Sequence, residues 1–187
     1  MLVIDQIIGD ELRVLINQVR PDGIVLAAPL SNMPHIVDAI SATNTPMVRL
    51  SPGQENGEHY TVMTNDREVS AEMTRYLASL GHKRIAFIKG HPEHKAVQNR
   101  FEGYKDGLTD SGLDYSESFV IDGDNSMGAG EAGAEKLLAM THRPTAIFAA
   151  NDDMAVGVIR AANRLGIQVP EELSVAGYDD ITLASQV

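Results

Sequence analysis

The 187-residue sequence contains no cysteine, which excludes disulfide bonds, thiol catalysis and thiolate metal sites. It also contains no apolar stretch long enough to span a bilayer, and residues 1–5 lack the charged and apolar regions of a signal peptide. The lack of cysteine fits a cytosolic and an exported protein equally well, but the lack of a spanning segment and of a signal peptide leads us to expect a soluble, cytoplasmic protein with no membrane partner.

Basic residues are scarce: 15 Lys and Arg stand against 26 Asp and Glu, for a formal net charge of -11. Affinity for nucleic acid comes mainly from Lys and Arg that neutralise phosphates, so this segment alone is not expected to hold DNA. Its 43% hydrophobic content is enough for a buried core, in one large domain or two small lobes.

Amphipathic segments alternate with short runs of Val, Ile, Ala and Phe, which is typical of strand–helix units around parallel sheets. The expected fold class is therefore α/β, with a polar loop at 51–58. Helices are expected near residues 9–19, 33–42, 68–80, 97–111, 130–140 and 153–165, and strands near 24–28, 47–50, 60–63, 84–88, 119–121, 145–149 and 173–176.

Gly81 is expected to cap the third of these helices, and a new series of strands begins directly after it. We therefore place the boundary between two lobes at residues 81–83. This division gives an N-terminal lobe over residues 1–80 and a C-terminal lobe over residues 81–187.

Polar side chains follow several of the expected strands, at the positions where open parallel sheets bind their ligands. Amide and carboxylate groups of this kind suit bidentate hydrogen bonds to hydroxyl-rich molecules. The residues in question are Ser31, Asn32, His91, His94, Asn151, Asp152, Asp153, Asp179 and Asp180.

Each of these polar residues also has a structural interpretation. Asn151 and Asp179 are both suited to capping helix N-termini, and a cap can also contact a ligand. Arg100 lies in the first turns of its helix, where the macrodipole disfavours a cation. A nearby carboxylate or ligand oxygen would explain it, as would simple exposure to solvent.

The sequence contains no recognisable metal site or catalytic group. His91 and His94 lack a third ligand at a known spacing, so the histidines, His82 included, are interpreted as structural. Asp179 and Asp180 are adjacent on an extended segment and should point apart, which argues against a paired acid site. Neither a serine-nucleophile elbow nor a phosphate-binding loop is present.

Residues 128–133 fit the pattern G-x-G-x-x-G, and Asp152 follows at the distance of a ribose-binding acid. A dinucleotide-dependent oxidoreductase is therefore one alternative. In such sites the first glycine follows its strand almost directly, whereas here residues 122–127 intervene. The separation favours glycines that enter a helix instead of a phosphate-binding turn, so no cofactor is expected.

Several segments together resemble the regulatory core of the lac repressor family. Their order and spacing match that family throughout, and the resemblance covers essentially the whole chain. The segments are residues 21–26 (PDGIVL), 76–88 (YLASLGHKRIAFI), 100–104 (RFEGY), 144–157 (PTAIFAANDDMAVG) and 169–180 (VPEELSVAGYDD).

The resemblance implies a two-lobed fold of the periplasmic-binding-protein type, with a small effector such as a sugar or nucleobase between the lobes. It implies that Arg100, Asn151 and Asp179 contact the effector from the second lobe. It also places Ser31 and the pair Asn65-Asp66 on the side of the first lobe.

Two departures from the family pattern bear on the ligand. Relatives often show Asp-Asn where this chain has Asn65-Asp66. Many place an aromatic ring at the position of Asn125, and without that ring, stacking on a sugar or purine is weakened.

The resemblance further implies that a helix-turn-helix head binds operator DNA in the full-length protein, as a homodimer. That head would precede this chain, and the first lobe would be completed by a first strand and a returning segment that the chain lacks. The alternative within the same fold is an exported solute-binding protein for transport. The sequence directly upstream distinguishes the two, because a regulator requires the head and a transport protein requires a signal peptide.

Overall fold

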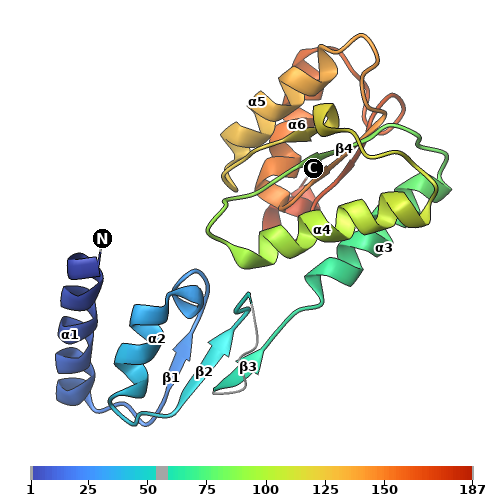
Figure 1. Cartoon of the computed structure of the whole chain (residues 1–187). Helices are drawn as coiled ribbons and strands as arrows, with labels where there is room; N and C mark the ends of the chain where they lie inside the picture. Colours follow the sequence, from blue (N-terminus) through green and yellow to red (C-terminus); the bar gives the residue numbers. More distant parts are fainter. Residues whose placement is uncertain (1, 54–58, 187) are drawn as a thin grey trace. The chain divides into compact units, whose positions relative to one another are not determined.

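The computed structural model of the chain describes residues 2–53 and 59–186, so the expected loop at 51–58 lies partly outside the described residues. The chain divides into two compact units (Figure 1). The first comprises residues 1–64 with 93–96, and the second comprises residues 65–92 with 97–187. Each unit has its own parallel sheet and its own core, as expected for an α/β fold.

The first unit contains a three-stranded parallel sheet in the order β1-β2-β3. Its strands are β1 (Ile24–Leu26), β2 (Met47–Leu50) and β3 (Tyr60–Val62). Its helices are α1 (Leu2–Val19), the short 3-10 turn η1 (Leu30–Asn32) and α2 (Pro34–Ser41). Pro34 stands at the start of α2, where its missing N–H costs no helical hydrogen bond.

Only one face of this sheet is covered within the described residues of the unit. Leu26 and Met47 pack beneath α1 and α2, against Ile16, Ile36, Val37 and Ile40. Successive strand residues point to opposite faces, so Val25, Tyr60 and Val62 point away from that core and are exposed.

The second unit contains a four-stranded parallel sheet in the order β5-β4-β6-β7. Its strands are β4 (Ile85–Ile88), β5 (Val120–Ile121), β6 (Ala146–Ala149) and β7 (Ser174–Ala176). The other elements are α3 (Asp66–Ser79), α4 (Lys95–Asp110), η2 (Glu117–Phe119), α5 (Met127–Leu138), α6 (Asp152–Arg164) and η3 (Thr182–Gln186).

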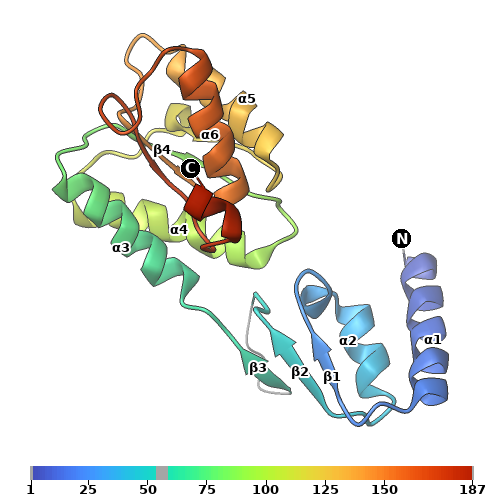
Figure 2. The same ribbon diagram turned by 180° about the vertical axis from the view of Figure 1, so that it is seen from behind.

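Helices cover both faces of this second sheet, which explains why β4 and β6 are continuous apolar runs (Figure 2). Phe87 of β4 packs on Phe148 of the neighbouring strand and on Tyr104 of α4, with ring centroids 5.2 and 5.0 Å away. Ile88, the next residue, points to the opposite face and meets Gly133 of α5.

His82 joins the amino-terminal ends of three strands in this sheet. Its ring nitrogens lie 2.9 Å from the Thr145 hydroxyl and 3.0 Å from the Ser174 hydroxyl. The structural role expected for this histidine agrees with that geometry. In the described residues, no group of three or more His, Asp or Glu side chains is arranged to hold a metal ion.

The units divide at residues 64 and 65, one helix earlier than the boundary expected at Gly81. Helix α3 belongs with the second unit because it packs closely on α4. Gly103 and Gly107 lack side chains where the α3 backbone passes, and a Cβ atom at Gly107 would lie 2.6 Å from the Ala71 carbonyl oxygen. Leu77 and Ala71 are buried on this side of α3. Such packing between two helices is not visible in the hydrophobic pattern of either one.

Among the described residues, no helix combines the length and the apolar character that crossing a bilayer requires.

Candidate functional site

The polar residues of the second unit meet at the carboxyl ends of its strands. Asn125 follows β5, His91 follows β4, Asn151 follows β6 and Asp179 follows β7. Parallel strands end at the same edge of a sheet, so these segments, far apart in the sequence, come together there. Hydrogen bonds and an ion pair connect these segments, in part through Arg100.

Arg100 is the centre of this arrangement. Its Nε donates to the Asp66 carboxylate at 2.9 Å, its Nη1 donates to the Ala150 carbonyl oxygen at 2.6 Å, and its Nη2 lies 3.0 Å from the Asp179 carboxylate. The Tyr178 ring stacks on the guanidinium, 3.6 Å from Cζ. The side chain of Arg100 is only 11% exposed. The position of a cation in the first turns of α4 is therefore explained by the nearby carboxylates. The alternative interpretation, an arginine exposed to solvent, is wrong.

Asp179 does not cap a helix, so the capping interpretation of this residue is wrong. It has a left-handed backbone with φ of 105°, and its carboxylate reaches Arg100. Asp152, not Asp179, holds the following segment, because its carboxylate accepts a hydrogen bond from the Ile181 amide at 2.9 Å. The pKa of Asp179 lies above its usual value, chiefly because of burial, although the Arg100 guanidinium lowers it.

Asn151 does cap its helix, as expected. Its Oδ1 accepts from the Met154 amide at 3.0 Å, while its Nδ2 donates to the Asn125 carbonyl oxygen at 3.0 Å. The same side chain thus starts α6 and holds the loop that follows β5. Asn151 and Arg100 are further connected through Ala150, whose carbonyl oxygen accepts from Arg100.

Asn125 occupies the position where many members of the family that the sequence resembles carry an aromatic ring. Its φ is 71°, in the left-handed region that asparagine tolerates better than most residues. Its Oδ1 accepts from the His91 amide at 3.1 Å, so it ties the loops after β4 and β5 together. A carboxamide here supplies hydrogen-bonding groups in place of an aromatic face.

The remaining predicted residues are placed differently. Asp66 is buried against Arg100, whereas Asn65 is exposed at the start of α3 and its side chain makes no capping bond. Ser31 belongs to the first unit, where it is fully buried and its hydroxyl donates to the Leu50 carbonyl oxygen at 2.9 Å. The structure therefore joins Arg100, Asp66 and Asp179 directly, while Ser31 lies in a separate unit.

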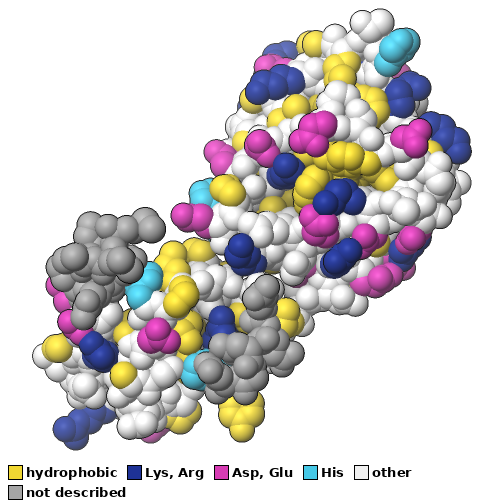
Figure 3. Space-filling view, viewed as in Figure 1, with side chains coloured by type: hydrophobic (Ala, Val, Ile, Leu, Met, Phe, Trp, Pro, Cys, Tyr) yellow, Lys and Arg dark blue, Asp and Glu magenta, His cyan; other side chains and the backbone are white. Residues whose placement is uncertain are grey.

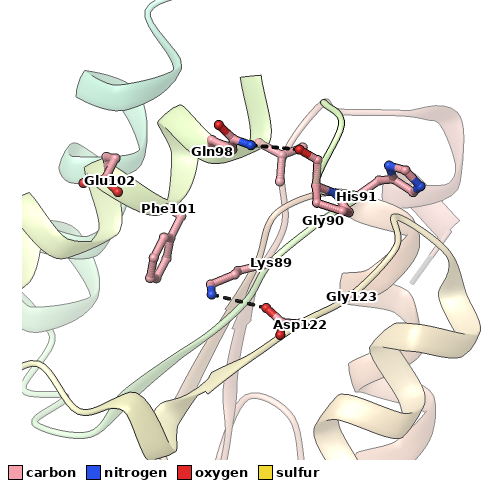
Figure 4. A pocket seen from close by; sticks show the side chains of 10 residues that line it. Lys89, Gly90, His91, Gln98, Phe101, Glu102, Asp122 and Gly123 are labelled. Atoms are coloured by element: carbon pink, nitrogen blue, oxygen red, sulfur yellow. Dashed lines mark hydrogen bonds and ion pairs between the residues drawn. The ribbon is translucent and has the colours of Figure 1, made fainter. Parts of the chain in front are cut away.

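A cavity of about 560 Å³ lies beside this cluster, between α4 and the ends of β4 and β5 (Figure 4). The Phe101 ring and the Lys89 ammonium group face it, and Lys89 lies 3.2 Å from the Asp122 carboxylate at its edge. Arg100, Asn151 and Asp179 do not line this cavity. It shares α4 and the loops after β4 and β5 with their cluster.

Sequence reasoning missed Tyr178, although this residue lies in the segment whose resemblance was noted. Stacking of a ring on a guanidinium depends on the fold, and nothing in the local sequence indicates it. The Ala150 carbonyl was missed for the same reason, because a backbone acceptor carries no sequence signal.

The glycines of residues 128–133 lie inside or at the start of α5, as expected, and not in a phosphate-binding turn. Among them Gly130 allows α5 to approach α6 closely, as does Gly157 on α6 itself. A Cβ atom at Gly130 would clash with the Met154 backbone, and one at Gly157 would clash with the Met127 carbonyl oxygen. This pattern therefore serves helix packing.

Charged side chains of both signs are interspersed on the face shown in Figure 3, and Lys and Arg do not gather into a basic patch there.

Residues 74–187 match the model of a family described as a periplasmic binding protein-like domain. The chain is 33% identical over 172 residues to the probable HTH-type transcriptional repressor ExuR of Bacillus subtilis (strain 168), an alignment that covers 92% of this chain and 52% of that protein. The chain spans about half the length of the curated relatives it matches.

Two solved structures show the same architecture. A sugar-binding transcriptional regulator of the LacI family from Escherichia coli, complexed with phosphate, is 30% identical with a TM-score of 0.80, covering 92% of this chain and 62% of that one. The complex of the transcriptional regulator CelR with cellobiose is 29% identical with a TM-score of 0.86, covering 96% of this chain and 55% of that one.

Proposed function

The chain belongs to the family of periplasmic binding protein-like domains, in the form found in lac repressor-type regulators, and from this premise we propose that it senses a small polar effector for a DNA-binding transcription regulator. Its role is binding without catalysis. In the full-length protein, we propose, a helix-turn-helix head binds operator DNA as a homodimer in the cytoplasm.

The observation that carries the proposal is the arrangement around Arg100. Three segments far apart in the sequence place Asp66, Ala150 and Asp179 on one guanidinium. A guanidinium has more N–H donors than these contacts use, so donors remain for a ligand. The Asp179 side chain is 38% exposed and supplies acceptors beside them.

Asn151 and Asn125 extend this polar surface with carboxamide groups. We propose that Arg100 and Asp179 hold polar edges of the effector, while Asn151 orients it. The resemblance adds Ser31 of the first unit and Asn65 at the start of α3 as further contacts. A sugar is a suitable effector class, because one solved relative is named as sugar-binding and another is a complex with cellobiose.

Regulation requires that the effector bind two states of the protein unequally, because equal affinity shifts nothing. We propose that the effector binds between two lobes and favours their closed state. In the full-length dimer, closure then changes the spacing of the two DNA-binding heads.

A thermal-shift screen of sugars, nucleobases and phosphosugars tests the proposal. An effector that prefers the native state raises the melting temperature in a concentration-dependent manner, because it adds about 2.7 kcal/mol of stability at a concentration about 100 times its Kd. We expect Arg100→Ala to remove this shift for the compound that produces it in the wild type.

Arg143→Ala is the matched control, because Arg143 makes an exposed ion pair with Glu172 away from the cluster. This variant should keep the full ligand-induced shift. A compound that stabilises the wild type and Arg100→Ala equally would contradict the proposed site.

A further inference from the structure

Asp66 is an acidic residue with almost no exposure to solvent. Its side chain is 3% exposed, and burial of an ionised carboxylate is unfavourable unless it is paired and hydrogen-bonded. Arg100 provides that pairing through Nε. Asp66 therefore cannot lose Arg100 without a large electrostatic cost, and the two side chains constrain one another.

The contact through Nε determines how the guanidinium is oriented. Because the group is planar and rigid, a partner on Nε fixes the directions in which both Nη atoms point. In this structure one Nη points to the Ala150 carbonyl and the other to Asp179. The Tyr178 ring closes one face, and burial together with the Asp66 carboxylate raises the pKa of Tyr178 to about 12.

The position of Asp66 along the chain gives this contact a second consequence. Asp66 is the first residue of α3, and the chain passes from the first unit to the second between residues 64 and 65. The residue whose carboxylate orients Arg100 is thus adjacent in sequence to the segment that joins the two units.

We propose that Asp66 is a positioning residue: its buried carboxylate orients Arg100 for the effector and couples the state of Arg100 to the segment that joins the two units. This inference deepens the proposed function and rests on it for the identity of the site. Asp66 itself does not contact the effector. A ligand that binds to Arg100 and Asp179 then alters the ion pair between Arg100 and Asp66 at the start of α3.

The experiment uses Asp66→Asn, which keeps the size of the side chain and removes its charge. The first measurement is the pKa of the Asp179 carboxyl group, which is determined by a pH titration monitored with carbon NMR. The groups that act on Asp179 are Arg100, Asp66, Asp152 and the surrounding protein, which desolvates it. Asp66 raises the pKa of Asp179, and Arg100 lowers it.

In Asp66→Asn we expect the pKa of Asp179 to fall. One negative charge is removed, and Asp179 remains as the carboxylate that pairs with the guanidinium among the residues that the structure describes. The second measurement is hydrogen exchange at the Arg100 Nε–H group. It should become about tenfold faster or more, because a hydrogen bond to a charged acceptor is replaced by a weaker one.

Asp106→Asn is the matched control. Asp106 pairs with Arg67 between the same two helices, at 2.5 Å, but both side chains are exposed. This variant should leave the pKa of Asp179 and the exchange of Arg100 Nε–H unchanged. The same changes in both variants would show general loosening of α3 against α4 and would overturn the proposal, as would no change in Asp66→Asn.

A third variant covers the case in which Asp66→Asn does not fold. In Arg100→Lys, the compact ammonium group cannot reach Asp66, Ala150 and Asp179 together. Backbone hydrogen exchange should then accelerate at residues 66–68, and unchanged protection there would overturn the coupling. None of these measurements needs the effector, so failure of the ligand screen and failure of this inference are distinguishable.

Discussion

At the scale of single residues, some polar side chains of this chain make two structural contacts at once. Asn151 satisfies an orphan amide at the start of α6 and also donates to the loop after β5. Ser126 caps α5 in the same way, accepting from the Ala129 amide, but it is exposed and its bond to Asp124 stays within the same loop. The two residues form a natural pair for comparison.

We expect Asn151→Ala to destabilise the protein more than Ser126→Ala does. Loss of a cap costs about 0.5–2 kcal/mol in either case. Asn151→Ala also leaves the Asn125 carbonyl without its donor in a partly buried place, which adds a desolvation cost. Urea unfolding of both variants measures the difference. Equal destabilisation would show that the bond to Asn125 contributes nothing to stability.

At the scale of elements, the glycines of α5 and α6 determine how closely these helices pack. Gly157 lies where a methyl group would meet the Met127 carbonyl oxygen and the Glu131 amide. Gly128 lies on α5 as well, but a Cβ atom there would have only the Ser126 hydroxyl near it, at 3.9 Å. One helix pair thus contains both a required glycine and a replaceable one.

We expect Gly157→Ala to lower the free energy of unfolding by about 1–3 kcal/mol, because the added methyl group overpacks the interface. Gly128→Ala should leave stability unchanged or raise it by up to about 1 kcal/mol, since alanine favours helix. Chemical denaturation of the two variants provides the measurement. A stability loss at Gly128 as large as at Gly157 would indicate that helix propensity and not packing governs both sites.

Most elements were predictable because their hydrophobic periodicity is strong. The strand at residues 85–88 and the helix at residues 152–164 differ from expectation by one residue or so at their ends, the usual uncertainty of helix and strand termini. The convergence of Asn151 and Asp179 was also predictable, because parallel strands end at one edge. The contact of Asp66 with Arg100 was not, since it depends on how α3 crosses α4.

At the scale of the whole molecule, the assignment of α3 decides which part of the chain forms a self-sufficient core. Arg67 and Arg75 on α3 pair with Asp106 and Asp110 on α4, in exposed positions that contribute little each. The larger contribution comes from the buried side of α3, where Leu77 joins the core of the second unit and Ala71 is also buried. This burial removes apolar surface from water on both helices.

We therefore expect a fragment of residues 65–187 to fold cooperatively, and a fragment of residues 81–187 to be markedly less stable. Removal of α3 uncovers the face of α4 that contains Gly103 and Gly107, and it leaves Arg100 without Asp66. Thermal unfolding followed by circular dichroism compares the two fragments. Extension of the shorter fragment to residue 74 is the control, because it restores Leu77 but neither Ala71 nor Asp66. Equal stability of the fragments that begin at 65 and at 81 would place the boundary back at Gly81, and α3 would then be a connector with no share in the second core.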